Sequence, residues 1–405
     1  MQILKAKYII TCDNDFNILK NSCVAFNKRI VAVGNESEMR AKFKDADFTD
    51  LGNVVITPAL VNSHVHLEFS SNRSELIYGD FITWLGSIVA NGAKVAKKCT
   101  QNLMAQTLKN MMKSGVGTIG AISSYGKDLQ ILALSSARVI FFNEILGSNG
   151  EFVEQNFLNF MLRFNESVKY KNEHFTPALS LHSPYSVHPN LAKKALKFAH
   201  EKGLIVSTHF LESKAERQWL EKGNGKFKEH LKHFVPEPKP MYEIDEYLSL
   251  FNGIRTLFTH CVYVNNFTKF DKDLHSITHC VVSNRLLGKK SLNLNQISKQ
   301  GLTLNIGTDG LSSNISLNLW DELRAVLLTH PRTELNKLAK VAFIAATRGG
   351  ARALGLQSGE ITVGKLADIA VFTAPKCDTD TLLTQLILHT KLAKRLYIGG
   401  EICKF

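Results

Sequence analysis

The sequence contains no apolar run long enough to cross a membrane. A membrane-spanning helix needs about 18 uninterrupted apolar residues, whereas the longest apolar runs among these 405 residues have the length of single strands. Residues 1–7 also lack the apolar core of a signal peptide. These absences predict a chain with no membrane partner and no secretion signal.

Paired cysteines are missing as well. No Cys-x-x-Cys pair occurs, which argues against a disulfide framework and against a thiolate zinc site. Such cysteine usage favours a reducing, cytoplasmic location. The seven cysteines are scattered along the chain: Cys12, Cys23, Cys99, Cys261, Cys280, Cys377 and Cys403.

The charge balance is basic but shows no concentrated basic patch. Lys and Arg number 49 against 36 Asp and Glu, which gives a formal charge of +13. The densest basic stretch, residues 222–239, is interrupted by Glu229, Glu237 and apolar residues, as in a solvated helix and loop. We therefore expect attraction for small anionic molecules rather than a nucleic-acid partner.

The order of apolar segments indicates an α/β protein built on a (β/α)8 barrel. Eight strand-like runs alternate with helical material, as buried parallel strands do. A doubly wound open sheet is the rival architecture. The runs lie at residues 54–66, 116–122, 137–142, 177–182, 204–209, 254–260, 277–282 and 302–309.

The two ends of the chain have a similar pattern of short β-type segments, which differs from the pattern of the middle. Residues 1–56 and 357–405 read as short β-runs separated by turns, with no helical alternation. We expect these two ends to pair into a small β-sandwich domain, and residues 57–356 to form the barrel.

Polar residues gather where the expected barrel strands end. Barrel enzymes build their active sites at the carboxyl ends of their strands. Each of these residues alone is more often structural, but their joint placement on one rim predicts a metal site. The residues are His64, His66, His182, His209, Glu212, His260, His279, Asn284 and Asp309.

Residue types and spacing suggest the chemistry of that site. His64 and His66 stand two apart, so on a strand both imidazoles point to one side. Three imidazoles and one carboxylate suit one divalent ion, with Zn²⁺ favoured and Fe²⁺ or another first-row metal as alternatives. A water on such an ion has its pKa lowered toward ~7. Glu212 is then placed to carry a proton, His260 to hold the water, and Asp309 to take the water's proton.

Several motifs resemble those of the amidohydrolase superfamily: residues 57–66, His209-Phe210-Leu211-Glu212, Thr259-His260-Cys261, residues 279–284, residues 308–314 and Gly364-Lys365-Leu366-Ala367-Asp368. The resemblance implies metal binding by His64, His66, His209 and Asp309, with Glu212 and His260 catalytic. Dinuclear members carry a lysine at strand 4, but residues 180–185 contain none, which favours a single metal. Ala59 and Val281 stand where the superfamily usually has glycine and proline.

Within the superfamily, the His-x-x-Glu and Ser-Asn motifs resemble the branch of chlorohydrolases and of adenosine-type and guanine deaminases. Residues 78–87, 283–287 and 314–324 are similar to the bacterial aminofutalosine deaminases of the alternative menaquinone route. This implies an adenine nucleoside substrate, 6-amino-6-deoxyfutalosine, which ends in a benzoate. The alternatives are S-adenosylhomocysteine, methylthioadenosine or adenosine, another N-heterocycle hydrolysed as in chlorohydrolases, or a non-catalytic scaffold.

The resemblance also suggests which residues contact the substrate. His182 resembles a substrate-contacting histidine, and Trp84 resembles a pocket-wall aromatic, although a helix-face core residue would look the same. Related nucleoside deaminases carry an acidic ribose-binding residue where this chain has Ala93. Asn284 and Ser313 complete the expected substrate-binding set, and Arg285 and Arg73 are the candidates for a benzoate carboxylate. A homo-oligomer is compatible with the sequence but is not predicted by it.

Overall fold

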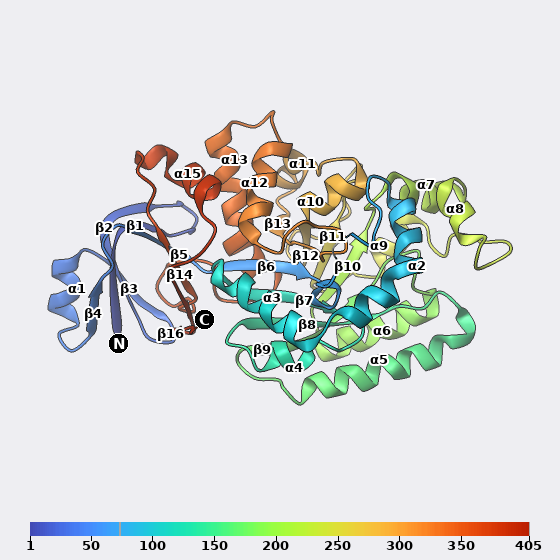
Figure 1. Ribbon diagram of the computed structural model, residues 1–405, viewed down its shortest axis with the longest axis horizontal. Helices are drawn as coiled ribbons and strands as arrows, with labels where there is room; N and C mark the ends of the chain where they lie inside the picture. Colours follow the sequence, from blue (N-terminus) through green and yellow to red (C-terminus); the bar gives the residue numbers. More distant parts are fainter. Residues whose placement is uncertain (73, 405) are drawn as a thin grey trace.

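The computed structural model of the protein describes residues 1–72 and 74–404. It contains two β-sheets, each of eight strands, that lie side by side along the longest axis of the molecule (Figure 1). One sheet holds strands from both chain ends, and the other holds the strands of the central region.

The smaller unit is a single mixed sheet, and it confirms that the two chain ends pair. Strand β5 runs parallel to β1 and antiparallel to β14, which joins the N-terminal and C-terminal parts. The strands are β1 (Gln2–Ile10), β2 (Ile18–Phe26), β3 (Ile30–Gly34), β4 (Asp47–Asp50), β5 (Val54–Pro58), β14 (Ile369–Thr373), β15 (Arg395–Ile398) and β16 (Glu401–Ile402). Helix α1 (Glu36–Lys42) precedes β4.

The larger sheet confirms the predicted barrel. Its eight strands are all parallel and follow the order of the sequence, β6 to β13. They are β6 (Leu60–Val65), β7 (Val116–Ser123), β8 (Arg138–Ile145), β9 (Phe175–Leu181), β10 (Val206–Phe210), β11 (Thr256–His260), β12 (His275–His279) and β13 (Thr303–Ile306). Nearly every residue of these strands is buried, as their apolar composition predicts.

Side chains bring the first and last barrel strands together. The amide of Asn62 donates to Thr308 Oγ1 at 2.8 Å, and its oxygen accepts from the Thr308 backbone N–H at 3.1 Å. The Asp309 N–H donates to the His64 carbonyl oxygen at 3.0 Å. These bonds hold the ends of β6 and β13 beside each other, where the histidine pair lies.

The expected first strand, residues 54–66, is two strands in the structure. Strand β5 belongs to the small sheet, and β6 belongs to the barrel. The chain changes sheets at Ala59, whose N–H donates to the Asp368 carbonyl, while the Leu60 N–H donates to the Gly115 carbonyl next to β7. The domain limits at residues 57 and 356 remain a prediction.

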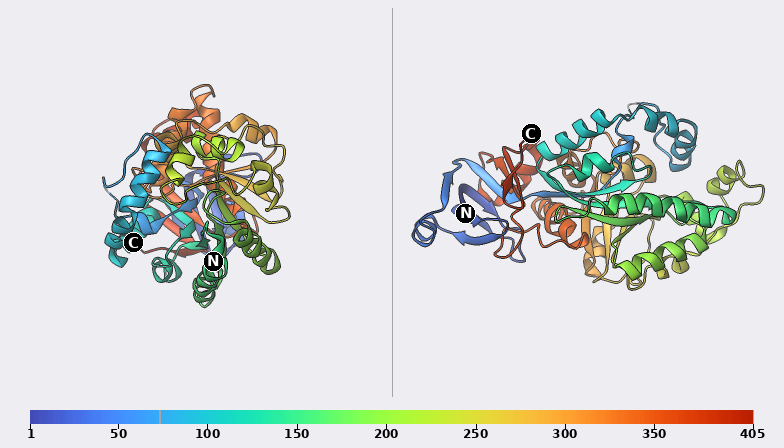
Figure 2. Two further views of the ribbon diagram at one scale, coloured as in Figure 1. Left: turned by 90° about the vertical axis from the view of Figure 1, so that its right-hand side faces the viewer. Right: turned by 90° about the horizontal axis from the view of Figure 1, so that it is seen from below.

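Helices surround the barrel strands, as the left view of Figure 2 shows. The main ones are α2 (Phe81–Lys98), α3 (Gln101–Lys113), α5 (Val153–Val168), α6 (Pro189–Lys202), α7 (Lys214–Lys222), α8 (Lys226–Leu231), α9 (Ile244–Ser249), α11 (Leu294–Lys299), α12 (Leu319–Thr329), α13 (Leu335–Ile344) and α15 (Leu382–His389). Shorter ones are α4 (Leu129–Ala133), α10 (Val281–Ser283), α14 (Gly350–Ala353) and the π-helices η3 (Asn284–Gly288) and η4 (Ala345–Gly349). The predicted helix after Pro189 ends at Gly203, which adopts a left-handed conformation.

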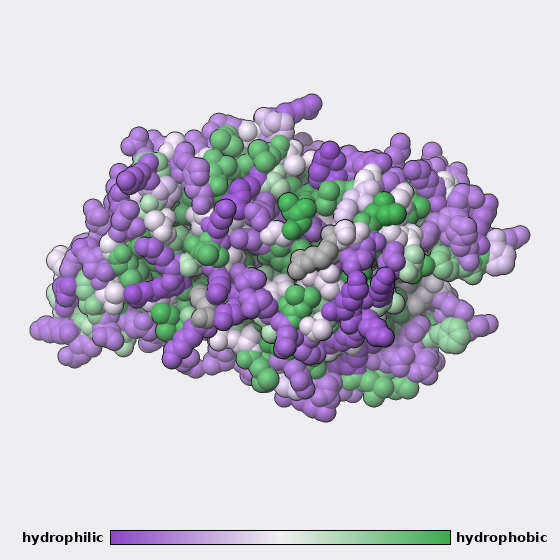
Figure 3. Space-filling view, in the orientation of Figure 1, coloured by the Kyte–Doolittle hydropathy of each residue, from purple (hydrophilic) through white to green (hydrophobic). Residues whose placement is uncertain are grey.

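The surface is predominantly hydrophilic, with apolar residues in small groups on the face drawn in Figure 3. Among residues 1–72 and 74–404, no helix combines the length and the apolar character needed to cross a membrane. All seven cysteines are free.

Candidate metal centre and active site

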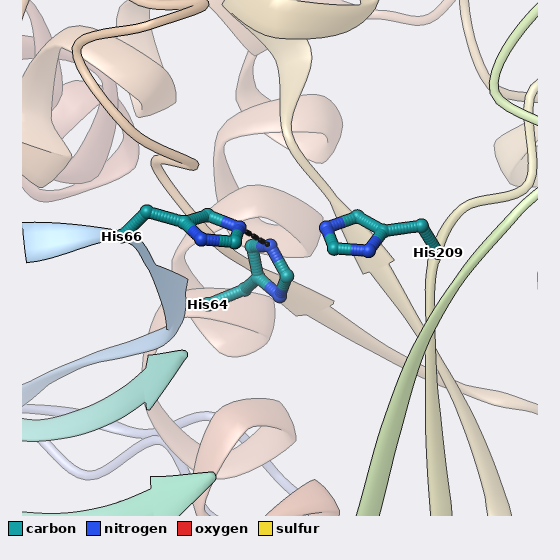
Figure 4. Close-up of side chains that lie close together, drawn as sticks. All are labelled: His64, His66 and His209. Carbon is teal, nitrogen blue, oxygen red and sulfur yellow. Dashed lines mark hydrogen bonds between the residues drawn. The ribbon is translucent and has the colours of Figure 1, made fainter. Parts of the chain in front are cut away.

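Three imidazoles converge at the carboxyl end of the barrel (Figure 4). His64 lies in β6 and His66 directly after it, and their Nε2 atoms are 3.2 Å apart. His209, in β10, places its ring centroid 4.9 Å from that of His64 and 5.5 Å from that of His66. One donor atom from each of the three lies within 4.8 Å of the other two, so a single ion could contact them all.

Asp309 supplies a carboxylate at the same point. Its Oδ1 lies 3.5 Å from His66 Nε2 and 3.9 Å from His64 Nε2. The opposite oxygen, Oδ2, accepts hydrogen bonds from Ser283 Oγ at 2.8 Å and Ser313 Oγ at 2.7 Å. The two hydroxyls fix the carboxylate so that Oδ1 faces the imidazoles. The structure thus brings together all four residues predicted as metal ligands.

The backbone at the strand ends adopts conformations that non-glycine residues seldom use. Leu211, His260 and Asp309 have φ angles of 47°, 73° and 57°. Each follows or ends a different strand, β10, β11 or β13. Left-handed conformations of this kind cost free energy and concentrate at functional sites. All three lie at the rim, where the backbone leaves the strands beside the site.

Burial keeps the histidines neutral at pH 7. Burial is the largest effect on His209 and lowers the pKa of its imidazole to about 4, and it likewise lowers the pKa of His64 and His66 below the usual value. Burial alone raises the pKa of the Asp309 carboxyl, but the surrounding imidazoles of His66, His260, His64 and His209 outweigh it, so the net pKa falls below the ordinary range. The cluster therefore offers neutral nitrogens and an ionised carboxylate, which is the protonation state that metal ligands need.

The hydrogen bonds around the imidazoles fit a bound cation. His209 Nδ1–H donates to the His182 carbonyl oxygen at 2.9 Å, which leaves the lone pair on Nε2. The Thr259 hydroxyl lies 3.2 Å from His64 Nδ1 and can hold the proton of His64 on that side. With its proton on Nδ1, His64 presents the lone pair of Nε2 toward His66 Nε2, 3.2 Å away, and His66 Nδ1 is buried without a hydrogen-bond partner among the described residues. The Nε2 lone pairs of His64 and His209 can therefore bind a cation at this point.

Glu212, His260 and Asp309 form a second group next to the first. One donor atom from each lies within 4.8 Å of the others. Glu212 Oε2 is 3.6 Å from His260 Nε2, and both side chains are buried. Burial, reinforced by the charges of Asp309 and Glu216, raises the pKa of the Glu212 carboxyl well above its usual value. Burial therefore favours the protonated form of Glu212, whereas it lowers the pKa of His260 to about 4.

The loop that bears Glu212 is held by a buried carboxylate one turn further on. Glu216 accepts the N–H groups of Leu211 at 3.0 Å and Glu212 at 2.8 Å. Ser213 caps helix α7 by accepting the Glu216 N–H at 3.0 Å. These bonds fix the turn between β10 and α7, which positions the proton-bearing Glu212.

Of the residues predicted to bind substrate, His182, Trp84 and Ser313 lie around this centre. The His182 ring centroid is 5.0 Å from that of His209, and His182 Nδ1 pairs with the Ser186 hydroxyl at 2.6 Å. Trp84, in α2, donates its indole N–H to the Ser312 carbonyl at 2.8 Å. The tryptophan therefore connects α2 to the loop after β13 and is only partly buried. Ser313 touches the centre through Asp309.

The remaining candidates differ in their exposure. Arg285 lies in η3 with its side chain exposed to solvent. Asn284 is buried, and its amide contacts two histidines, His260 at 2.8 Å and His279 at 3.1 Å. Arg73 falls outside the described residues. Ala93 is exposed on α2.

The sequence analysis did not identify the residues that hydrogen-bond to the predicted ligands or lie next to them. Thr259 and Ser283 contact a predicted ligand each, and both belong to motifs whose role in the site could have been inferred from their position beside a ligand strand. Glu144, at the end of β8, was missed entirely. Its carboxylate lies within 4.8 Å of ring nitrogens of His182 and His209, and it is buried with a raised pKa, mainly because of burial. Its apolar surroundings in the sequence gave no signal.

Comparison with known proteins places this geometry in a family. The model of the Amidohydrolase family matches residues 55–400, which covers the whole barrel and strands β14 and β15 of the small sheet. The chain belongs to the amidohydrolase family. The resemblance drawn from the motifs is thereby confirmed, and the chain is a hydrolase by fold and by family.

Similar proteins match this family member over their full length. An aminodeoxyfutalosine deaminase of Nitratiruptor sp. is 41% identical over 406 residues, covering 99% of each chain. An adenosine deaminase of Helicobacter pylori is 36% identical, again covering 99% of each chain. The crystal structure of H. pylori aminofutalosine deaminase in complex with methylthio-coformycin superposes with a TM-score of 0.94 at 34% identity, covering 100% of both chains.

Proposed function

We propose that this amidohydrolase is a metal-dependent deaminase that replaces the C6 amino group of an adenine nucleoside with oxygen. The observation that carries the assignment is the buried Glu212, whose carboxyl lies next to three converging imidazoles and the Asp309 carboxylate. The substrate best supported is 6-amino-6-deoxyfutalosine, hydrolysed to futalosine and ammonia. The 41% identity to an aminodeoxyfutalosine deaminase over the full chain supports this choice.

His64, His66, His209 and Asp309 would hold the metal ion, because their donor atoms converge and their protonation states suit a cation. A divalent ion, when bound, lowers the pKa of water toward ~7 and so supplies a nucleophile at neutral pH. One ion per chain is expected, with Zn²⁺ favoured by the three-imidazole and one-carboxylate donor set.

Glu212 is the proton donor of the proposed reaction. Attack of water on C6 pushes electron density onto N1, and a protonated carboxyl at N1 can neutralise that density. Burial raises the pKa of Glu212 well above its usual value and so favours the form that can donate this proton. When the C6–N bond breaks, one water proton has reached N1 through Glu212 and the other leaves with ammonia, so the enzyme returns to its starting state.

His260 and Asp309 would orient the water. His260 Nε2 is buried without a hydrogen-bond partner among the described residues and lies 3.9 Å from Asp309 Oδ2. A lone pair on that nitrogen can accept one O–H of the water, and the Asp309 carboxylate can accept the other. The same carboxylate can then transfer the proton toward the departing amine.

Substrate contacts are assigned to the rim. His182, Asn284 and Ser313 would border the purine, and Trp84 would form a wall because it reaches from α2 to the loop after β13. A benzoate carboxylate requires a cation at the solvent side of the site, and the exposed Arg285 on η3 offers one. Arg73 is retained as the second candidate.

A second function is favoured by one comparison. The H. pylori relative named adenosine deaminase shares 36% identity over the full length. We therefore keep adenosine, methylthioadenosine and S-adenosylhomocysteine as alternative substrates. Hydrolysis of a chlorinated N-heterocycle and a non-catalytic scaffold have no comparable support from these relatives. A cytoplasmic location and homo-oligomer formation are further expectations.

The test is a comparison of kcat/KM for ammonia release from aminodeoxyfutalosine, adenosine, methylthioadenosine and S-adenosylhomocysteine, and for chloride release from a chlorotriazine. We expect the futalosine derivative to be preferred and Arg285→Ala to raise its KM while leaving the KM for adenosine unchanged.

Glu212→Gln should lower kcat by about 10²–10⁴ without loss of bound metal, because the amide has a similar shape but cannot transfer the proton of the carboxyl group. Turnover by Glu212→Gln at the wild-type rate would refute the assigned proton donor.

A further inference from the structure

A chain of four hydrogen-bonded side chains leads from the site to the outside of the barrel. It begins at His260, the last residue of β11, and ends at His330, the residue that follows α12. Between them lie Asn284, the first residue of η3, and His279, the last residue of β12. Three contacts join the four: 2.8 Å from His260 Nδ1 to Asn284 Oδ1, 3.1 Å from Asn284 Nδ2 to His279 Nδ1, and 3.1 Å between the Nε2 atoms of His279 and His330.

The amide of Asn284 gives this chain a direction. An amide oxygen only accepts and an amide nitrogen only donates, so His260 carries its proton on Nδ1 and His279 has a lone pair on Nδ1. A neutral imidazole has one N–H, so the proton of His279 is on Nε2 and is donated to Nε2 of His330. His330 must then hold its own proton on Nδ1.

The two outer histidines are neutral at pH 7, as this scheme requires. Burial lowers the pKa of His279 well below its ordinary value. Burial also lowers the pKa of His330, which remains partly exposed at the outer end. Neutral rings have one donor and one acceptor nitrogen each, so every bond in the chain depends on the others.

This direction of the hydrogen bonds determines whether His260 Nε2, the nitrogen that faces the site, has a proton or a lone pair. With its proton held on Nδ1, His260 presents the lone pair of Nε2 toward Glu212 and Asp309, where the proposed water would bind. The reverse arrangement of the chain would place an N–H there instead, and the ring could not accept from the water. The protonated position on His260 is thus set by groups that do not touch the substrate.

We propose that His279 and His330 are positioning residues that, through Asn284, fix the acceptor nitrogen of His260 toward the reacting water. Asn284 then acts by orienting His260, in addition to its predicted place beside the purine. The effect on turnover rests on the proposed deaminase function. The protonated positions of the rings do not, because they can be observed in the protein without any substrate.

Because His330 is partly exposed, a substitution there can break this chain of hydrogen bonds without disturbing the packing of the core. His330→Leu removes the acceptor for His279 Nε2–H and keeps a side chain of similar bulk. His330→Gln restores a carbonyl oxygen that can accept the same proton. His200→Leu, at an exposed position of α6 far along the chain from these elements, is the matched control.

The first readout is the tautomer of each ring, from ¹⁵N chemical shifts of histidine-labelled protein with and without zinc. We expect Nδ1–H for His260 and Nε2–H for His279 in the wild type, in His330→Gln and in His200→Leu. In His330→Leu we expect His279 and His260 to lose these single tautomers. Observation of Nδ1–H on His279 in the wild type, or unchanged tautomers in His330→Leu, would overturn the assignment.

The second readout is turnover of aminodeoxyfutalosine. Loss of an outer hydrogen-bonding partner typically costs 10–100-fold, so we expect kcat to fall about tenfold in His330→Leu with KM nearly unchanged, and to recover in His330→Gln. Equal losses in both His330 variants, with wild-type tautomers, would show that His330 only supports the fold. If no nucleoside is turned over, the proposed function fails, while the tautomer measurement still decides the role of the chain.

Discussion

At the scale of single residues, burial sets the chemistry of this site. It keeps His64, His66 and His209 neutral and leaves Glu212 protonated, because a charge without a strong partner is costly inside the barrel. Asp309 stays ionised despite its burial, because imidazoles surround its carboxylate and two serine hydroxyls donate hydrogen bonds to it. Nearly identical carboxyl groups a few ångströms apart thereby acquire opposite protonation states, which is what separates a ligand from a proton donor.

Another buried carboxyl, that of Glu322, makes folding stability depend on pH. Glu322 in α12 accepts the Val281 N–H at 2.8 Å and the Asn314 amide, yet burial raises its pKa to about 8. In the unfolded chain its pKa is about 4.3. Between these values the folded state keeps a proton that the unfolded state has lost, so the free energy of unfolding falls as pH rises.

We expect the difference in unfolding free energy between wild type and Glu322→Gln to fall by up to about 1.4 kcal/mol per pH unit from pH 5 to pH 8. The glutamine cannot titrate, so all other groups cancel in this difference. Urea unfolding at pH 5, 6.5 and 8 measures it. A difference that is constant over this range would mean that Glu322 is ionised in the fold.

At the scale of strands, the sequence was informative where one residue type recurs at one place. Apolar runs that alternate with helical material predicted the barrel, polar residues at the ends of those runs predicted a metal site, and the resemblance to the amidohydrolases implied its four ligands. The same reasoning joined β5 and β6 into one strand, because residues 54–61 form an almost unbroken apolar run and only the pairing partners distinguish the two strands. It also could not predict the chain from His260 to His330, since hydrogen-bond direction depends on side-chain orientation and not on spacing.

The contact between β6 and β13 depends on a glycine. A Cβ on Gly307 would lie 2.7 Å from the His64 Cβ and 2.9 Å from the His64 carbonyl oxygen. Gly307→Ala must therefore separate the two strand ends that carry His64 and Asp309. We expect a loss of about 1–3 kcal/mol in stability from overpacking and weaker zinc binding by at least about tenfold.

Gly86→Ala in α2 is the control for that change, because a Cβ there meets no atom within 4 Å. It should be neutral or slightly stabilising, since alanine favours helix more than glycine does. Zinc titration and thermal unfolding compare the variants. Zinc binding by Gly307→Ala with wild-type affinity would show that the strand ends tolerate the separation.

At the scale of the whole molecule, the barrel and the small sheet share a core. One apolar cluster includes barrel residues such as Leu60 and Val116 together with Ala370 and Phe372 of the small sheet. Trp320 of α12 packs against Phe372 with ring centroids 5.0 Å apart. A shared core of this kind predicts that the two sheets unfold together.

A buried ion pair crosses the same boundary. Arg138, at the start of β8, donates from Nε and Nη2 to the two carboxylate oxygens of Asp368 at 2.9 Å and 3.1 Å. Asp368 also accepts the Gly399 N–H at 2.8 Å, and Arg138 donates to the Glu173 carbonyl at 2.7 Å. Asp368 belongs to a motif that the sequence revealed, but its partner lies 230 positions away and only the fold identifies it.

Removing one partner should cost more than removing both. Asp368→Leu leaves a buried guanidinium without its carboxylate, and we expect a loss of about 3–5 kcal/mol, as for other broken buried pairs. The double variant Arg138→Met with Asp368→Leu replaces the pair by apolar side chains and should be clearly more stable than Asp368→Leu alone. Urea unfolding measures the free energy of unfolding of each variant. If the double variant were destabilised by the sum of the losses in the two single variants, the ion pair would contribute no coupling between the sheets.

The same unfolding curves, followed by fluorescence and by circular dichroism, test whether the two sheets unfold together. Separate transitions in the wild type would show that the shared core does not join the sheets into one cooperative unit.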